Sequence, residues 1–379
     1  MTNGLHSSTG EPWDPGPHTY ANSSAEITDG IWRMRLREND YYDTGYAYGV
    51  LLTRMRYPII RILKSRLVSW IINLAFRATR KHFSSIRVPD EYLDELRGYA
   101  DATGISYTSL YFINFCFDIL KRYGFHCSTI SLVHSDRTLI CRNTDLLPWI
   151  GSLALRWLPS IVVDIQTLER CRFVHIAPGF FLGAINGFNE CGVAIASHQV
   201  LPTREPAVSE GLASILLPRI LLEQSGTAEE ARHIVHRKRI RRCLNMMVTS
   251  ASEKTSHIYE ISPEYIHVIT AETHYLCCAT HFQHEDLHRL HRSSIEGSEK
   301  RLHLMNTLAR ESTGTIENAI AIMQNVENGT SHNGSGFSPT NEGTYQSFVI
   351  DLTHRALYIS NGKTLPVSLS GKYRAVLSS

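Results

Sequence analysis

The pattern that most constrains the fold lies after residue 126, where strand-like runs, two helix-like runs and further strand-like runs follow one another. Runs rich in β-branched and aromatic residues, bounded by turn residues, are typical of strands. The first set covers residues 128–133, 138–141, 160–166, 173–176, 180–186 and 193–199. The second set, which we expect to complete a second sheet, covers residues 246–250, 256–261, 265–270, 346–351 and 356–361. This order predicts a mixed α+β fold.

Two helices are expected between these sets, at residues 212–223 and 227–236. The second begins with Thr227, and Glu230 follows three residues later. A threonine and a glutamate at this spacing form a capping box, in which each side chain binds a backbone N–H of the first turn. The sequence therefore predicts that a helix begins at Thr227.

Cys127 opens the first expected strand, and Arg142 and Asp145 follow the second. Residues 134–137 read as the turn between the two strands, so the segment predicts a hairpin that brings its open ends together. A thiol beside an arginine and a carboxylate suits cleavage of an amide, because the thiol attacks while fixed charges hold the substrate. The alternative reading is a buried structural cysteine, since free cysteine is among the most buried residue types.

Composition narrows the class of protein. The 379 residues, 43% of them hydrophobic, suffice for a sizeable core, and a net charge of +2 argues against a nucleic-acid-binding protein. Eight cysteines without a CxxC pair predict reduced thiols rather than a disulfide framework. Residues 1–22 are polar and predict no secretory signal. We therefore expect a cytoplasmic protein.

The chain divides into three expected parts. Residues 1–29 are rich in turn formers and predict a disordered tail. Residues 30–126 form an N-terminal, largely helical segment, and residues 127–379 form the catalytic segment. Within the latter, residues 331–343 predict a mobile loop rich in Gly, Ser and Asn.

The stretch from Arg54 to Lys81 contains eight lysines or arginines and no acid. Its apolar centre, residues 67–76, is only ten residues long, whereas a bilayer-spanning helix needs about 20. We expect a basic amphipathic helix or pair of helices within residues 54–82. Two readings stay open: a segment that contacts anionic lipid at a membrane surface, or an ordinary domain helix with a solvated basic face.

Several motifs resemble the N-terminal-nucleophile hydrolases of linear amide C–N bonds, the family of acid ceramidase, N-acylethanolamine acid amidase, bile salt hydrolase and the penicillin-forming acyltransferase. They are Cys-Ser-Thr-Ile from Cys127, Cys-Arg-Asn-Thr-Asp-Leu from Cys141, and the segments 88–106, 217–223, 229–231 and 257–263. The likeness runs from about residue 43 to residue 362. It implies a four-layer αββα sandwich with an N-terminal helical lobe.

The resemblance also implies a mechanism. Members of this family cut their own chain before the cysteine, here between His126 and Cys127, which would leave an α/β heterodimer. The freed α-amine, with an ordinary pKa near 8, would then act as the general base. Asp145 would orient this amine, and Arg142 would lower the thiol pKa and place the scissile carbonyl. No cofactor or metal is implied.

Further site residues follow from the same resemblance. Gln199 and Val200 match positions that wall the substrate pocket and donate to the oxyanion, and Arg301 matches an arginine that structures the site. Thr280 stands where the family carries an asparagine amide, and Asn245 could replace that donor. A Cys-Arg pair of the penicillin-type enzymes has no counterpart in residues 331–334.

We therefore expect a self-processing cysteine amidohydrolase that acts on an N-acyl lipid or another small acylated molecule. An acyltransferase using the same acyl-enzyme, and a catalytically weakened lipid-binding homologue, remain alternatives. A minor alternative is a zinc hydrolase, because His284, Glu285 and His288 form a formal HExxH motif.

Overall fold

The hairpin that follows residue 125 belongs to a sheet of six strands. The structure, a computed structural model, describes residues 13–119, 126–167, 169–200, 210–290, 295–330 and 338–377. The six strands lie in the order β15 (Tyr275–Cys278), β5 (His126–Val133), β6 (Thr138–Asp145), β16 (Thr344–Asp351), β17 (Ala356–Ser360) and β18 (Tyr373–Leu377). β5 and β6 pair antiparallel along their whole length, so the predicted hairpin is confirmed.

A second sheet contains ten strands. Their order is β1 (His18–Tyr20), β2 (Ser23–Thr28), β3 (Ile31–Leu36), β7 (Ser160–Ile165), β8 (Phe173–Pro178), β9 (Asn186–Asn189), β10 (Val193–Gln199), β12 (Leu244–Ser250), β13 (Thr255–Ile261) and β14 (Ile266–Thr270). A short parallel pair, β4 (Ile86–Arg87) and β11 (Gly211–Leu212), stands apart.

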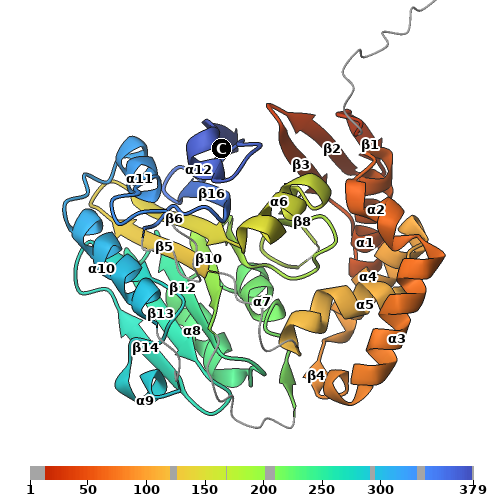
Figure 1. Cartoon of the computed structure of the whole chain (residues 1–379), viewed down its shortest axis with the longest axis horizontal. Helices are drawn as coiled ribbons and strands as arrows, with labels where there is room; N and C mark the ends of the chain where they lie inside the picture. The colour runs from red at the N-terminus through yellow and green to blue at the C-terminus, as the bar shows by residue number, and fades with distance from the viewer. Residues whose placement is uncertain are drawn as a thin grey trace, which may run out of the picture.

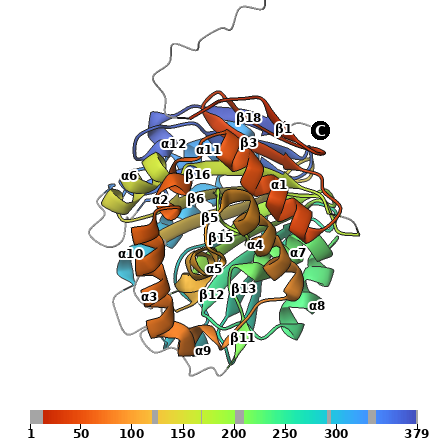
Figure 2. The ribbon, with the colours of Figure 1, turned by 90° about the vertical axis from the view of Figure 1, so that its right-hand side faces the viewer.

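The helices before residue 126 gather at one side of the molecule, and Figure 2 shows this side from the front. They are α1 (Tyr41–Arg54), α2 (Pro58–Leu63), α3 (Arg66–Phe83), α4 (Asp90–Thr103), α5 (Tyr107–Phe115) and a 3-10 turn, Cys116–Asp118. α1 and α4 pack backbone to backbone: a Cβ on Gly45 would lie 1.9 Å from the Glu95 carbonyl oxygen. Only glycine permits this approach.

The later helices are α6 (Pro148–Trp157), α7 (Leu216–Gln224), α8 (Ala228–Arg237), α9 (Glu285–His288), α10 (Glu296–Arg310), α11 (Ile316–Met323) and α12 (Val367–Ser370). Figure 1 shows α10 and α11 on the side opposite α1 to α5. Thr227 caps α8 and its hydroxyl accepts a hydrogen bond from the Glu230 N–H, which confirms the predicted start of this helix.

Alternating side chains place three hydrophobic clusters against the two sheets. In β7, Ile161 belongs to a cluster shared with α1, α4, α7 and α8, whereas Val162 belongs to a cluster shared with the six-stranded sheet. In β16, Phe348 faces this same inter-sheet cluster, and Val349 packs with Met305 of α10. Successive residues of a strand face opposite sides, so each sheet is buried on both faces.

Two expectations about the chain's layout were wrong. Residues 18–28, assigned to a disordered tail, form β1 and β2, because their hairpin extends the sheet beside β3. Within residues 30–126, β3 precedes the helices and pairs parallel with β7. The strands after α8 were expected to form a separate sheet, but β12 to β14 join β10, whereas β16 and β17 join the Cys127 hairpin. Residues 1–12 lie outside the described part of the chain.

A buried ionic cluster fastens α4 to α7. Arg219 donates from Nη2 to Glu95 Oε2 at 2.5 Å and from Nε to Glu223 Oε1 at 2.9 Å. Tyr92 donates to the other Glu223 oxygen at 2.6 Å, and its ring centre lies 4.9 Å from the guanidinium carbon. All four side chains are fully buried. The cluster therefore joins residues before Cys127 to residues after it.

Candidate active site

Cys127 is the second residue of β5 and is fully buried. Its register partner on β6 is Thr144, whereas Arg142 lies opposite Thr129. Side chains two residues apart share a face, so Arg142 is the diagonal neighbour of Cys127 across the hairpin. The Arg142 Nη2 donates to the Cys127 sulfur at 3.1 Å. The hairpin thus brings together the thiol and the arginine that the sequence singled out.

The Arg142 guanidinium is held by two further hydrogen bonds. Its Nη2 also donates to the Ser197 carbonyl oxygen at 2.7 Å, and its Nε donates to the Thr144 hydroxyl at 3.0 Å. The remaining nitrogen, Nη1, is buried and has no hydrogen-bond partner in the described part of the chain. A buried donor without a hydrogen bond destabilises the folded protein, so Nη1 marks a place where a ligand oxygen could accept one.

Opposing effects act on the pKa of the Cys127 thiol. Burial raises the pKa of Cys127, because a thiolate loses hydration there. The positive charge of Arg142 lowers this pKa, the negative charge of Asp145 raises it, and Arg301 lowers it again. Burial has the largest effect on this pKa, so the sulfur is a neutral thiol beside a guanidinium.

Asp145 ends β6 directly opposite His126, so it flanks the peptide bond between His126 and Cys127. Its carboxylate accepts from Asn341 Nδ2 and from the Thr344 hydroxyl, each at 2.6 Å. Burial raises the pKa of Asp145 to about 6, although Arg301 and these hydrogen bonds act in the opposite direction. Asp145 is thus a buried carboxylate beside this peptide bond.

Arg301 of α10 is the second buried arginine of the site. Burial lowers its pKa, while the charge of Asp145, and of Cys127 when ionised, acts in the opposite direction. Its Nη2 donates to the Thr280 hydroxyl at 3.2 Å. The Thr280 hydroxyl also lies within hydrogen-bond distance of the Ser298 hydroxyl, with 3.3 Å between the two oxygens. Thr280 therefore joins the cluster through Arg301.

The three other residues expected at the oxyanion are placed differently. The Val200 N–H donates to the Cys243 carbonyl at 3.4 Å, and the Asn245 amide donates to the Ala279 and His281 carbonyls at 3.2 and 2.7 Å. The donors of Val200 and Asn245 are thus already engaged with backbone carbonyls. Gln199 instead lines a cavity of 60 Å³ together with Arg142, and its Oε1 is buried without a described partner.

Residues that sequence reasoning missed complete the surroundings. Asn341 lies in the stretch expected to be a mobile loop, yet it is fully buried against Asp145. Thr344 and Gln346 both reach the hairpin because a β-bulge at Tyr345 shifts the register of β16 against β6. The Nε2 of His198 is hydrogen-bonded to the Thr129 hydroxyl at 2.7 Å, and burial keeps the pKa of His198 well below the usual range. No sequence pattern predicted this bulge. Residues 331–334 lie outside the described residues.

The histidine-rich segment does not form the helix that the zinc alternative needs. α9 has four residues, and His284 is its N-cap rather than a member of a helical pair. The His284 ring stacks on His267 at 3.7 Å, and His281 Nδ1 lies 2.7 Å from the Ser298 hydroxyl. Across the described ranges, no group of three His, Cys, Asp or Glu side chains could hold a metal ion.

The comparisons identify the class of protein. Residues 133–365 match the family of acyl-coenzyme A:6-aminopenicillanic acid acyl-transferase, and the chain belongs to this family. The match contains Arg142, Asp145, Thr280 and Arg301 and begins six residues after Cys127. The resemblance to N-terminal-nucleophile amidohydrolases that the sequence suggested is thereby confirmed. A search of the curated proteins gave no match.

The chain is similar to several solved structures at low identity. The Caenorhabditis elegans ortholog of N-acylethanolamine-hydrolyzing acid amidase is 13% identical, with 60% of this chain and 93% of that chain covered and a TM-score of 0.44. A mutant conjugated bile acid hydrolase from Clostridium perfringens is 9% identical, with 67% and 97% covered and a TM-score of 0.42. Penicillin V acylase from Agrobacterium tumefaciens is 12% identical, with 62% and 82% covered and a TM-score of 0.36.

Proposed function

We propose that this protein is a self-processing cysteine amidohydrolase that cleaves the linear amide of an N-acyl lipid or another small acylated molecule. The observation that carries the proposal is the 3.1 Å contact between Arg142 Nη2 and the Cys127 sulfur, at the start of a strand whose first peptide bond is flanked by Asp145. The thiol would be the nucleophile and the guanidinium would position it. The carboxylate would orient the α-amine that acts as the base.

Self-processing would begin at the His126–Cys127 bond. The Cys127 sulfur attacks the His126 carbonyl carbon, the C–N bond breaks, and the nitrogen of Cys127 takes the thiol proton. Water then hydrolyses the resulting thioester, which leaves a carboxylate on His126 and restores the thiol. The product is a chain that begins with the free α-amine of Cys127, next to Asp145.

Turnover would use this amine as the base. It accepts the thiol proton, the sulfur attacks the substrate carbonyl, and the leaving amine receives the proton as the acyl group stays on Cys127. The unpartnered Nη1 of Arg142 is the donor that we assign to the substrate carbonyl oxygen. Water then releases the acid, or an amine acceptor takes the acyl group.

The proposal also includes the layer architecture and the state of the chain after scission. The inter-sheet cluster and the two outer clusters support the four-layer αββα sandwich that the family resemblance implies. After scission, the parts before and after Cys127 would stay together as an α/β heterodimer. The parallel pairing of β3 with β7, the Arg219 ionic cluster, and the contact of Arg37 with Asp164 at 2.5 Å all cross this boundary.

The segment from α2 to α3 supports contact with a membrane surface. None of the described helices is long and apolar enough to cross a bilayer. Along α3, Leu67, Trp70, Ile71 and Leu74 are each more than half exposed and share one face at helical spacing, while Val68, Ile72 and Phe76 pack inward. The helix also carries several exposed arginines, so an apolar face flanked by cations would lie in the headgroup region of anionic lipid.

Acyl transfer is the second candidate, favoured by the name of the matched family. The test is a time course with N-oleoylethanolamine, with and without an added amine, followed by acid quenching and peptide mass analysis. We expect ethanolamine release and a thioester on the peptide that starts at Cys127. A new amide formed with the added amine would assign a transferase. Binding of the amide without release or acylation would instead support the weakened lipid-binding homologue, and activity that depends on zinc would revive the His284 alternative.

A further inference from the structure

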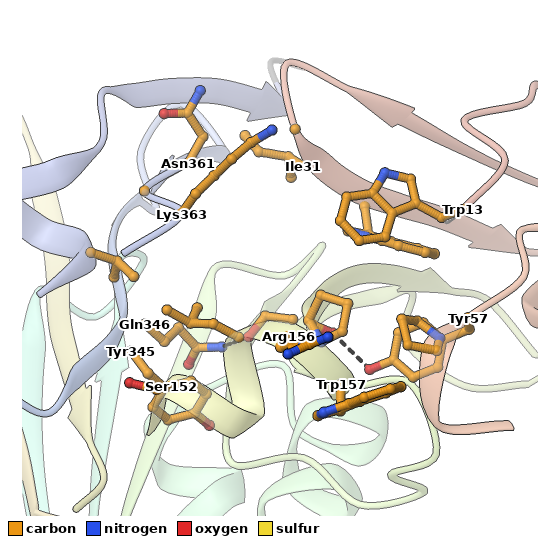
Figure 3. A pocket seen from close by; sticks show the side chains of 18 of the residues that line it. Trp13, Ile31, Tyr57, Ser152, Arg156, Trp157, Tyr345, Gln346, Asn361 and Lys363 are labelled. Atoms are coloured by element: carbon orange, nitrogen blue, oxygen red, sulfur yellow. Dashed lines mark hydrogen bonds between the residues drawn. The ribbon is translucent and has the colours of Figure 1, made fainter. Parts of the chain in front are cut away.

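A large cavity lies between the part of the chain before Cys127 and the part after it. It has a volume of 1220 Å³, and its walls come from α2 and β3 on one side and from α6, β16 and the segment after β17 on the other. Figure 3 shows Trp13, Tyr57, Trp157, Arg156 and Lys363 around it. Cys127 does not line this cavity. Its volume exceeds the range of about 300–1,000 Å³ that is common for small-ligand sites.

The inner wall of the cavity is aromatic and rigid. Trp32 is 3% exposed and Tyr57 is 1% exposed, and their rings meet edge to face at 5.3 Å. Trp13 packs on Trp32 in the same manner at 6.0 Å. The Tyr57 hydroxyl donates to the Pro159 carbonyl and accepts from the Gly179 N–H, at 2.8 and 2.9 Å. Trp32 and Tyr57 are thus packed within the wall, and the half-buried Trp13 and Trp157 offer ring surface to an apolar chain.

The rim of the cavity is basic. Five exposed cations line it, and no aspartate or glutamate is among its lining residues; the cations are Arg56, Arg61, Lys64, Arg156 and Lys363. The first four form no ion pair with any carboxylate of the described ranges. The whole chain has a net charge of only +2, so this concentration of positive charge is local. Positive charge around a concave opening attracts anions.

We infer that this cavity binds a single-chain amphipathic anion, with its hydrocarbon chain along the tryptophan wall and its carboxylate or phosphate at the basic rim. Charge complementarity and the aromatic wall carry this inference, and it does not depend on scission or on turnover at Cys127. Residues before Cys127 and residues after it in the sequence both line the cavity. The site would therefore persist only while these two parts of the chain stay together. The inner end is close to the reactive hairpin, since Gln346 lines the cavity and accepts from Thr144 at 3.4 Å.

Tryptophan fluorescence offers a direct test in the full chain. The protein has five tryptophans, of which Trp13, Trp32 and Trp157 line the cavity. Trp70→Phe and Trp149→Phe remove the two exposed ones, and Cys127→Ala excludes any contribution from scission or acylation. We would titrate this triple variant with monomeric oleate, with oleoyl lysophosphatidate and with the uncharged oleyl alcohol.

Oleate or the lysophosphatidate should change the fluorescence saturably and bind at least about tenfold more tightly than oleyl alcohol, and added salt should weaken this preference. The tighter of the two anions identifies the head group. Adding Arg61→Glu, Arg156→Glu and Lys363→Glu should reduce anion affinity by at least about tenfold and leave oleyl alcohol unchanged, because like charges repel. Trp157→Ala should weaken all three ligands.

The matched control places the same charge change elsewhere, with Arg237→Glu, Lys238→Glu and Arg239→Glu, which are exposed side chains that do not line the cavity. It should leave every affinity unchanged. Equal affinity for oleate and oleyl alcohol, or equal losses in the rim and control variants, would overturn the inference. Because catalysis is absent from the assay, failure of the proposed amidase activity would not mimic either result.

Discussion

Two fully buried arginine clusters lie in this protein, and they differ in how completely their charges are paired. Arg219 donates to two carboxylates, Glu95 and Glu223. Arg142 meets a neutral thiol and a backbone carbonyl and keeps one nitrogen unpartnered, while Asp145 receives hydrogen bonds from two neutral side chains. Complete pairing suits a cluster that fastens helices together. Incomplete pairing leaves groups available for substrate, which is why we place the chemistry at Cys127.

The largest effect on stability should come from the paired cluster. Arg219→Met leaves Glu95 and Glu223 buried without a cation, and removal of one partner from such a pair costs about 3–5 kcal/mol. Urea unfolding would measure the change in the free energy of unfolding. As a control, Arg232→Met removes a half-exposed partner of Glu229 and should cost less than about 1 kcal/mol. Similar costs for both variants would contradict a fastening role for Arg219.

The unpaired cluster should behave in the opposite way. Arg142→Met should lower kcat/KM by about 10²–10³-fold, as expected for loss of a donor at a developing oxyanion. Its cost in stability should be smaller than that of Arg219→Met, because Arg142 forms no direct ion pair within the described residues. Kinetics with N-oleoylethanolamine and urea unfolding of the same samples would separate the two effects. A variant that loses stability but retains kcat/KM would remove Arg142 from the chemistry.

Asp145 should make stability depend on pH in the uncut chain. Its pKa is about 6 in the folded protein and near 3.8 when unfolded, so the native state binds more protons between these values. Stability should therefore fall as pH rises from about 4 to about 6, by up to about 3 kcal/mol. Unfolding of Cys127→Ala at several pH values would measure this slope. Adding Asp145→Asn should make the slope shallower, and an unchanged slope would mean that other groups cause it.

Parts of this arrangement were readable from the sequence. The β5–β6 hairpin followed from two β-prone runs and a turn, and the contact of Arg142 with Cys127 followed from the hairpin's geometry together with the family resemblance. Long-range pairing was not readable. Local patterns do not say that β3 pairs with β7, that β12 joins β10, or that a bulge at Tyr345 aims Thr344 at Asp145, because such choices depend on packing between distant segments.

Substitutions in the basic segment from α2 to α3 should have the smallest effect per residue. Reversing Lys64, Arg66, Arg77 and Arg80 should abolish binding to anionic vesicles, since each cation near charged lipid contributes about 1 kcal/mol. Turnover of a long-chain N-acyl amide should fall with vesicle binding, whereas turnover of a short soluble amide should not change. Vesicle flotation and the two rates would test this. Equal loss on both substrates would make the segment a structural lid.

In the mechanism proposed for this protein, Cys127 becomes an N-terminal nucleophile. Intact mass analysis of the purified protein tests it most directly. We predict two fragments from the wild type, one ending at His126 and one beginning at Cys127, and a single uncut, inactive chain from Cys127→Ala. Cleavage at this bond in Cys127→Ala, or full amidase activity in an uncut wild-type chain, would contradict the claim.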